Sequence, residues 1–382
     1  MKKNIFNRFI YVALILIFIF SLINVYFINV RIKKMGEAKE IAKEILRPAQ
    51  LEIIKIVPSN CKDCFDIEKS SAKIKNQNVN ITGEEVIYFE SDKAKDIIKS
   101  YNLLRIPAIL IKGEINKSDQ LLKFFDNNGI VINNETAIYS NINPPYYDIK
   151  EEEVVGRVKV INLIDSSCNQ CKSLSQVENS LANAGVAISE IVSYEYNSND
   201  GKELISKHSV TRIPAILISE DVDYYESVKK ELTNLAGNPK NNYYAIHSVL
   251  PPYRDVKEDR ILGLVNIILL SDISCDGCYD VRINKNVVER FGIAIEKVDP
   301  YDISSDKGKA IIAMYKITKI PTLLVSPEAD VYASFVQVWD NVGTVEDDGW
   351  YVLRKPEVLG AYKDLIKNII VKQQVQQSRS AQ

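Results

Sequence analysis

The sequence repeats itself at an interval of 107 residues, and this period constrains the fold more than any other feature. All six cysteines lie in Cys-x-x-C pairs, and the first members of these pairs are Cys61, Cys168 and Cys275. Three Ile-Pro dipeptides keep the same interval, as do the segments at 143–150 (NPPYYDIK) and 250–257 (LPPYRDVK). Landmarks of several kinds in one frame indicate three copies of one structural unit. The repeats are expected at 51–157, 158–264 and 265–371.

Each repeat alternates short apolar runs with amphipathic segments. A β-branched run such as 158–164 comes first and is typical of a buried strand. Polar capping residues follow, and they predict that the cysteine pair opens a helix. The expected order is β-α-β-α-β-(insert)-β, which is an α/β fold class. A further helix is expected only at 357–371, and Pro-Pro-Tyr is interpreted as a short, stiff linker between repeats.

The N-terminal region contains one long apolar segment. Residues 9–30 include no charged side chain, and as a helix they span about 33 Å, which matches a hydrocarbon core of about 30 Å. No small-residue cleavage site follows, so we expect an uncleaved signal-anchor in the lipid bilayer. A short basic tail (1–8) precedes it and a helical stalk (31–50) follows. The basic N-terminus favours the cytoplasm, with the repeats outside it. Residues 372–382 are expected to be disordered.

Composition and charge exclude several classes of function. The net charge is −2, so the chain has no excess of basic residues for a nucleic-acid surface, and no nucleic-acid partner is expected. A structural zinc site takes four ligands, usually from two close pairs, and three identical units would leave one cysteine pair over. The two histidines, His208 and His247, do not recur with the period. We therefore expect no metal and no cofactor.

The conjunction of a strand, a Cys-x-x-C and an Ile-Pro about 46 residues further on resembles the thioredoxin superfamily. The resemblance covers about residues 51–371 and implies three tandem thioredoxin-like domains (α/β) behind one N-terminal transmembrane helix. The chain departs from thioredoxins proper, because no tryptophan precedes the pairs and no proline separates the cysteines. The buried acid that thioredoxins carry on the preceding strand is replaced by Lys55, Asn162 and Leu269.

The cysteine pairs are the candidate catalytic residues. A thiolate at a helix N-terminus has a lowered pKa, because the helix dipole and free N–H groups stabilise its charge. A second thiol within reach can resolve a mixed disulfide, so we expect the first cysteine to attack and the second to resolve. Basic residues two positions before each proline (Arg105, Arg212 and Lys319) are expected near the sulfurs. The six candidates are Cys61, Cys64, Cys168, Cys171, Cys275 and Cys278.

The Ile-Pro dipeptides are the candidate substrate-binding residues. The resemblance implies that these peptide bonds are cis and face the cysteines. Such a segment would expose backbone groups with which an extended client strand could pair. The six residues are Ile106, Pro107, Ile213, Pro214, Ile320 and Pro321.

Two functions of different classes fit these features. The first is a membrane-anchored thiol-disulfide oxidoreductase, with protein thiols or disulfides as clients and a separate redox donor or acceptor as partner. The second is a redox-inactive tandem scaffold or binding protein whose cysteine pairs only stabilise each repeat. Exposure of the first cysteine distinguishes the two, because an accessible sulfur favours the enzyme and a buried one favours the scaffold.

Overall fold

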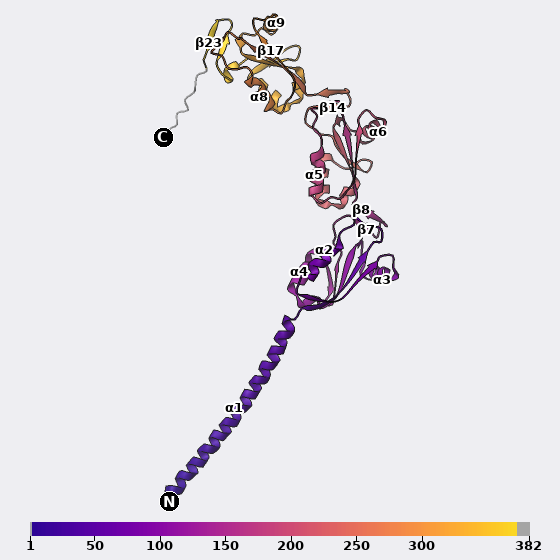
Figure 1. The fold of residues 1–382 in the computed structure, drawn as a ribbon, viewed down its shortest axis with the longest axis vertical. Coiled ribbons are helices and arrows are strands. Elements are labelled where there is room, and N and C mark those ends of the chain that lie inside the picture. Colours follow the sequence, from indigo (N-terminus) through magenta and orange to yellow (C-terminus); the bar gives the residue numbers. More distant parts are fainter. Residues whose placement is uncertain (1, 373–382) are drawn as a thin grey trace. The chain divides into compact units, whose positions relative to one another are not determined.

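The structure is a computed structural model that describes residues 2–372, without the side chains of residues 2–13 and of Asn127. It divides into two compact units, Met1–Val155 and Gly156–Gln382. The first unit contains the N-terminal helix and the first repeat, and the second unit contains the other two repeats (Figure 1). Apart from Lys372, the tail that we expect to be disordered lies outside the described residues.

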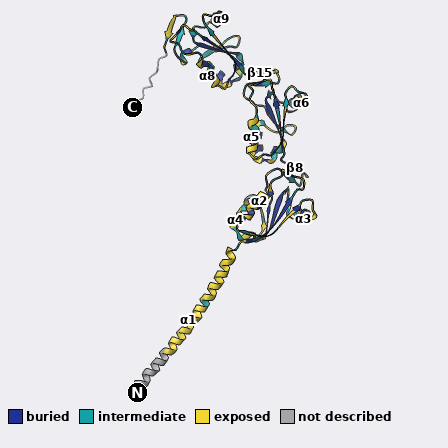
Figure 2. Cartoon of the chain, in the orientation of Figure 1, coloured by how far each residue is buried: buried dark blue, intermediate teal, exposed yellow. Residues whose placement is uncertain are grey.

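The N-terminal helix α1 (Lys2–Leu46) runs without a break through the residues expected as basic tail, membrane span and most of the stalk. Its part from Leu14 to Leu46 is long and apolar enough to cross a membrane. Figure 2 shows that almost all of this part is exposed, so most of its apolar side chains do not pack into a protein core. The stalk ends earlier than expected, because the first strand already begins at Ala49.

The first repeat is built on a five-stranded sheet of order β2-β1-β4-β6-β5. Strand β1 pairs parallel with β2 and antiparallel with β4, and β4 pairs antiparallel with β6. Helices α2 and α4 pack on one face of the sheet and α3 on the other. The elements are β1 (Ala49–Val57), α2 (Ile67–Lys75), β2 (Val79–Tyr88), α3 (Asp92–Tyr101), β3 (Arg105–Ile106), β4 (Ala108–Gly113), the 3₁₀ helix η1 (Ile115–Lys117), α4 (Asp119–Asn128), β5 (Gly129–Asn133), β6 (Thr136–Tyr139), β7 (Tyr146–Asp148) and β8 (Glu153–Val155).

The second repeat has the same central order, β10-β9-β12-β13, with the same parallel and antiparallel pairings. Its elements are β9 (Val158–Ile164), α5 (Ser175–Asn183), β10 (Ile188–Glu195), α6 (Asn199–His208), β11 (Arg212–Ile213), β12 (Ala215–Ser219), η2 (Glu220–Tyr224), α7 (Glu226–Ala236), β13 (Tyr243–Ile246), β14 (Tyr253–Asp255) and β15 (Arg260–Leu262).

The third repeat again has this order, β17-β16-β19-β21-β20. The predicted fold class is confirmed, since each repeat has the expected order β-α-β-α-β followed by a helical insert and a further strand. Its elements are β16 (Leu264–Ser271), α8 (Ile283–Glu289), β17 (Ala294–Asp302), α9 (Asp306–Tyr315), β18 (Lys319–Ile320), β19 (Thr322–Val325), η3 (Pro327–Val331), α10 (Ala333–Trp339), β20 (Gly343–Val345), β21 (Tyr351–Leu353), η4 (Pro356–Val358), β22 (Tyr362–Asp364) and β23 (Ile369–Val371).

The first strand of each repeat forms the centre of its core. In β1, Leu51 and Ile53 face one hydrophobic cluster, whereas Ile54 and Ile56 face the other, and all four are buried. A strand that is covered on both faces reads as a continuous apolar run, which is why the sequence shows no alternation there. Figure 2 shows burial concentrated in the sheets of all three repeats.

In each repeat a serine caps the N-terminus of the second helix of the fold. A serine hydroxyl accepts a hydrogen bond from the backbone N–H three residues further on, which satisfies one of the free N–H groups of the first turn. The capping serines lie at the 107-residue interval and are Ser91 in α3, Ser198 in α6 and Ser305 in α9.

Each repeat also has a second, three-stranded sheet that the sequence did not predict. The two residues before the proline pair with a hairpin, in the orders β3-β7-β8, β11-β14-β15 and β18-β22-β23. Two expectations are therefore wrong: Pro-Pro-Tyr enters this hairpin rather than forming a plain linker, and 357–371 holds η4, β22 and β23 rather than a helix.

An aspartate two residues after the first tyrosine of each hairpin explains its turn. The carboxylate of Asp364 accepts hydrogen bonds from the N–H groups of Ile366 and Lys367, and Asp148 and Asp255 make the equivalent bonds. Such side-chain bonds compete with helix formation and favour turns.

Candidate redox site

The cysteine pairs lie in the loops that follow the first strand of each repeat. The next helices begin at Ile67, Ser175 and Ile283, three to five residues after the second cysteine, so the expectation that the pair opens a helix is wrong. In the second repeat the N–H of Cys171 instead donates to the carbonyl oxygen of Cys168 at 3.3 Å, which is a tight turn. The effect of a helix dipole falls off within the first turn, so it contributes less to these thiols than we expect from the sequence.

Each pair forms a disulfide within its own motif. The Cα atoms are 5.4 Å apart in Cys61–Cys64 and in Cys168–Cys171, and 5.5 Å apart in Cys275–Cys278. Each loop therefore brings its two sulfurs within bonding distance, which is the geometry that reversible disulfide chemistry requires.

The first cysteine differs in exposure between the repeats. Cys168 and Cys275 are buried, with exposed fractions of 7% and 9%, whereas Cys61 is partly exposed. The second cysteines, Cys171 and Cys278, are also partly exposed. An attacking sulfur must be accessible, so the expected role of the first cysteine fits the first repeat better than the other two.

In the third repeat the proline segment contacts the cysteine loop. The three Ile-Pro peptide bonds are cis. In the third repeat, Sγ of Cys278 lies 3.9 Å from the carbonyl oxygen of Ile320, and the hydroxyl of Tyr279 donates to the carbonyl oxygen of Pro321 at 3.2 Å. The structure thus brings two of the sequence-predicted groups into contact there.

The strand before each proline pairs along one edge with the chain's own hairpin. Ile106 pairs with Tyr147, Ile213 with Arg254 and Ile320 with Lys363, all within the chain's own hairpins. All six candidate isoleucines and prolines are also buried. Each of these short strands (β3, β11 and β18) stands at the end of its three-stranded order, so the hairpin occupies one of its two edges. Client binding at the Ile-Pro segments stays a prediction.

The basic residues before the prolines pack on the same hairpins. The guanidinium carbons of Arg105 and Arg212 lie 4.8 and 4.4 Å from the ring centres of Tyr146 and Tyr253, and Nζ of Lys319 lies 5.1 Å from the ring of Tyr362. Cation–π contacts of this kind stabilise a packed arrangement by about 0.5–2 kcal/mol. Lys319 also pairs with Glu357 at 2.9 Å. The described contacts of these three cations are thus with hairpin tyrosines and Glu357 rather than with sulfur.

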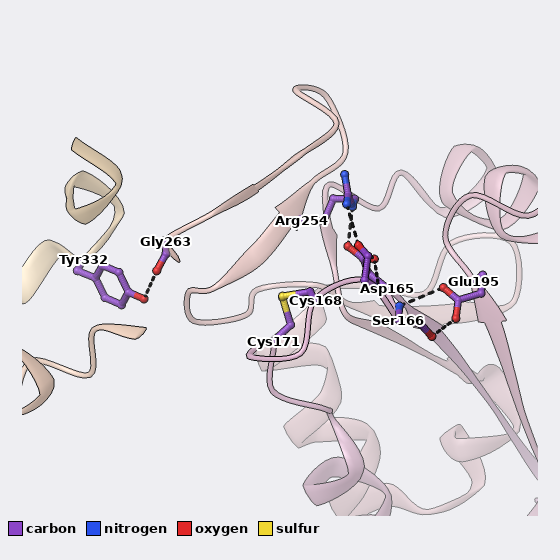
Figure 3. Close-up of a disulfide and its surroundings, with 9 residues drawn as sticks. Asp165, Ser166, Cys168, Cys171, Glu195, Arg254, Gly263 and Tyr332 are labelled. Carbon is purple, nitrogen blue, oxygen red and sulfur yellow. Dashed lines mark hydrogen bonds and ion pairs between the residues drawn. A yellow bond between two sulfur atoms is a disulfide. The ribbon is translucent and has the colours of Figure 1, made fainter. Parts of the chain in front are cut away.

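A buried ion pair joins the cysteine loop of the second repeat to its hairpin (Figure 3). Nε of Arg254 in β14 donates to Oδ2 of Asp165 at 2.6 Å, and the side chain of Asp165 is only 2% exposed. Arg254 also reaches Oγ of Ser167, the neighbour of Cys168, at 3.2 Å. The carbonyl oxygen of Asp165 accepts from the N–H of Cys168 at 3.1 Å. Burial tends to raise the pKa of Asp165, but hydrogen bonds from Ser167 and Arg254 outweigh it, so this pKa is lowered.

The third repeat has the equivalent pair. Nζ of Lys363 in β22 lies 2.6 Å from Oδ2 of Asp272, whose side chain is 6% exposed. Asp272 also accepts from the N–H of Ser274 at 2.9 Å, and its carbonyl accepts from the N–H of Cys275. Burial tends to raise the pKa of Asp272, but Lys363 and Ser274 outweigh it and the pKa is lowered.

The first repeat replaces this ion pair with apolar contacts. The position of Asp165 is occupied by Pro58 and that of Arg254 by Tyr147. The ring of Tyr147 packs at 4.5 Å from that of Phe89, whereas Arg254 lies 4.4 Å from the ring of Tyr196, which is the equivalent of Phe89.

A buried cation takes the place of the thioredoxin acid in the first repeat. Lys55 on β1 is 4% exposed, and its Nζ lies 2.7 Å from carboxylate oxygens of both Glu68 and Glu84. Burial tends to lower the pKa of Lys55, but the two carboxylates outweigh it and the pKa is raised. In the second repeat, Asn162 donates to Glu178 instead, at 2.6 Å.

The sequence alone does not predict these two ion pairs, although it contains one signal for the buried aspartates. Asp165 and Asp272 are 107 residues apart and stand three residues before a cysteine. Their partners lie in segments that we interpret from the sequence as linker and helix, so the pairing could not be inferred. The hairpin brings them to the cysteine loop, and only the structure shows the hairpin.

Comparisons with known proteins identify similar structures but no family. No known family profile and no curated protein matches the chain. Similar solved structures include a protein disulfide oxidoreductase from Aeropyrum pernix (17% identical, 51% of this chain and 92% of that chain) and human ERp44 (12% identical, 78% and 85%). A domain of the alkylhydroperoxide reductase AhpF from Enterococcus faecalis also matches (14% identical, 45% and 83%). The TM-score is 0.14 in each case, so the fold assignment rests on the strand order described above.

Proposed function

We propose that this chain is a membrane-anchored thiol-disulfide oxidoreductase whose Cys-x-x-C pairs exchange disulfides with protein clients. The observation that carries the proposal is the recurrence, in each repeat, of a closed cysteine pair and an Ile-Pro segment on a sheet of the same strand order. The six cysteines are the catalytic residues in this proposal. The Ile-Pro segments are the client-binding residues in this proposal.

The proposed chemistry needs only two electrons and two sulfurs per site. In the oxidising direction, a client thiolate attacks one sulfur of the disulfide and releases the other as a thiolate. A second client thiolate then displaces the mixed disulfide, so the client gains a disulfide and the pair becomes a dithiol. A separate disulfide-bearing acceptor must reoxidise the pair. The reducing direction runs the same steps backwards, with a dithiol donor as the partner.

The membrane anchor is part of the proposal. The segment Leu14–Leu46 supports it by its length and apolar character. We propose that the N-terminus lies in the cytoplasm and the three repeats outside it, where disulfides persist.

A redox-inactive scaffold is the second candidate, and the burial of Cys168 and Cys275 favours it for two of the three repeats. In that case the disulfides would only hold the loops in place. Both candidates have the same fold but differ in whether a client ever bonds to sulfur.

Trapping of mixed disulfides separates the two candidates. The full-length protein is expressed with a single Cys→Ser substitution at each of the six positions in turn. The cells are then quenched with acid, and free thiols are alkylated. The oxidoreductase predicts client-linked species, abolished by reductant, for at least one variant of the first repeat (Cys61→Ser or Cys64→Ser). If all six variants trap nothing, the catalytic proposal fails and the scaffold stands. Double Cys61→Ser/Cys64→Ser serves as the matched control that cannot form a mixed disulfide at this site.

A further inference from the structure

The three cysteine loops differ in what ties them to their hairpins. In the second and third repeats a buried carboxylate three residues before the first cysteine is paired with a hairpin cation, whereas the first repeat has Pro58 and Tyr147 at these positions. The cysteine is buried where the ion pair is present (Cys168 and Cys275) and partly exposed where it is absent (Cys61).

The hairpin cation connects both halves of the candidate site. The backbone of Arg254 pairs with Ile213, directly before Pro214, while its side chain reaches Asp165 and Ser167 in the cysteine loop. Lys363 occupies the same place, because it pairs with Ile320 and binds Asp272. Figure 3 shows Arg254 reaching from the hairpin to Asp165, in the loop that carries Cys168.

The pair is well placed to resist opening of the loop. Removing one partner from a buried ion pair leaves an uncompensated buried charge, so the two groups separate only with difficulty. Asp165 is held further by the N–H of Ser167, and Arg254 by the carboxylate and carbonyl of Asp259. A thiol from solution can attack the disulfide only when a sulfur becomes accessible.

We propose that Asp165–Arg254 and Asp272–Lys363 are latches that hold each hairpin against its cysteine loop and slow disulfide exchange there, so that the unlatched first repeat exchanges fastest. These four residues are positioning residues, since they act on sulfur through the loop that carries it. This inference rests on the proposed function in so far as exchange with a client is the activity that the latches regulate.

Site-resolved reduction of the full-length protein in detergent micelles tests the proposal. Dithiothreitol supplies two electrons per disulfide: one of its thiolates attacks a sulfur, its second thiol displaces the mixed disulfide, and the products are a cysteine dithiol and oxidised, cyclic dithiothreitol. Samples are quenched with N-ethylmaleimide at successive times, and mass spectrometry of the three cysteine peptides gives three rate constants. The latch predicts that Cys61–Cys64 is reduced at least about tenfold faster than the other two pairs.

Latch variants should change one rate at a time. Arg254→Ala should raise the rate of Cys168–Cys171 about tenfold and leave Cys275–Cys278 unchanged, and Lys363→Ala should do the reverse. Arg254→Lys should restore slow reduction, because the third repeat uses lysine at this place. Arg260→Ala on the same hairpin is the matched control, since Arg260 is exposed and pairs only locally with Glu258; its rates should equal those of the parent protein.

The reciprocal change guards against a variant that fails to fold. Introducing the latch into the first repeat by Pro58→Asp with Tyr147→Arg should slow the reduction of Cys61–Cys64, a gain that simple damage to the fold cannot produce. Unchanged rates in Arg254→Ala and in the double variant would overturn the latch, as would an Arg254→Lys variant as fast as Arg254→Ala. If these rates change as expected but no client is ever trapped, the latch stands and the proposed oxidoreductase function fails.

Discussion

Ala94 of the first repeat corresponds to Gly201 and Gly308 of the other two, at the third position of the helix that follows the capping serine. A Cβ added at Gly201 would overlap the backbone carbonyl of Glu195, and one added at Gly308 would overlap that of Asp302. The absence of a side chain at these positions therefore lets helices α6 and α9 approach the preceding strand closely.

Gly201→Ala should destabilise the second repeat by about 1–3 kcal/mol, because the overlap with backbone outweighs the gain of up to about 1 kcal/mol in helix propensity. Hydrogen exchange of the peptides that cover β10 and α6 measures the effect within the full chain. Gly83→Ala is the control, since its Cβ would meet only the flexible side chain of Glu52. A Gly201→Ala variant with unchanged or greater protection would contradict the packing described for α6.

His208 at the end of α6 couples the stability of this repeat to pH. Its side chain is buried, and burial lowers its pKa below the ordinary value, with the charges of Lys207 and Lys240 adding to the effect. The folded state therefore favours the neutral imidazole, and the unfolded state binds more protons. Stability from this group is fully present above a pH of about 6.5 and is lost as the pH falls towards the lowered pKa.

We expect hydrogen-exchange protection of α6, corrected for intrinsic rates, to fall between pH 7.5 and pH 5.5. The His208→Asn variant should lose most of this dependence, and the remainder should come from His247, whose pKa is also lowered by burial and by Arg212. If the His208→Asn variant keeps the full pH dependence of the parent protein, titratable groups other than His208 cause that dependence.

At the scale of elements, a buried tyrosine fixes the start of each of the last two repeats. The hydroxyl of Tyr332, which precedes α10, donates to the carbonyl oxygen of Gly263 at 2.7 Å (Figure 3). It also accepts from the N–H of Ala294 at 3.0 Å. Tyr225 makes the same two bonds to Gly156 and Ala187. The first repeat has Ser118 at this position, where it caps α4 instead.

Tyr332→Phe should cost about 1–3 kcal/mol, because it leaves a buried carbonyl and a buried N–H without their shared partner. The loss should be confined to β16, β17 and η3, and hydrogen exchange of these elements measures it. Tyr362→Phe, a change to a hairpin ring that is only partly buried, is the matched control. Equal protection in both variants would show that the two hydrogen bonds contribute little.

How well each element can be predicted from the sequence depends on whether the residues that determine it are neighbours in the chain or far apart. Strands such as β1 and β16 are local apolar patterns that recur with the period, so the sequence sufficed for the fold class. The hairpins depend on pairing between the segment before the proline and residues some 40 positions later, for which no local signal exists. The segment 357–371 has the amphipathic pattern of a helix, but the turn at Asp364 overrides it.

The candidate site was predictable only in part, for the same reason. The six cysteines and the Ile-Pro segments are sequence motifs, and the structure places Cys278 beside Ile320. The burial of Cys168 and the pairing of Asp165 with Arg254 are tertiary properties. They distinguish the repeats from one another, whereas the motifs alone make them look equivalent.

At the scale of the whole molecule, the account requires that one helix holds all three repeats at a membrane. Replacing Leu16 and Phe20 with lysine should release the protein from the membrane fraction, because a charged side chain at the centre of a bilayer costs at least about 2.5 kcal/mol. Alkaline extraction followed by immunoblotting measures the release. Protease added outside sealed vesicles of known orientation should reach the repeats only from the non-cytoplasmic side. Parent protein that is extracted as readily as the lysine variant would contradict the anchor.

The most direct test of the central claim is disulfide exchange between the full-length protein and a protein client. The oxidised chain, in detergent micelles, is mixed with a reduced, unfolded protein that contains two cysteines, and the redox state of all three pairs is followed by alkylation and mass spectrometry. Cys61–Cys64 should become a dithiol first, in step with the appearance of one disulfide in the client, and the two latched pairs should follow more slowly. If all three pairs keep their disulfides while the small reductant dithiothreitol still opens them, the chain is not an oxidoreductase of proteins and its cysteines only stabilise the fold.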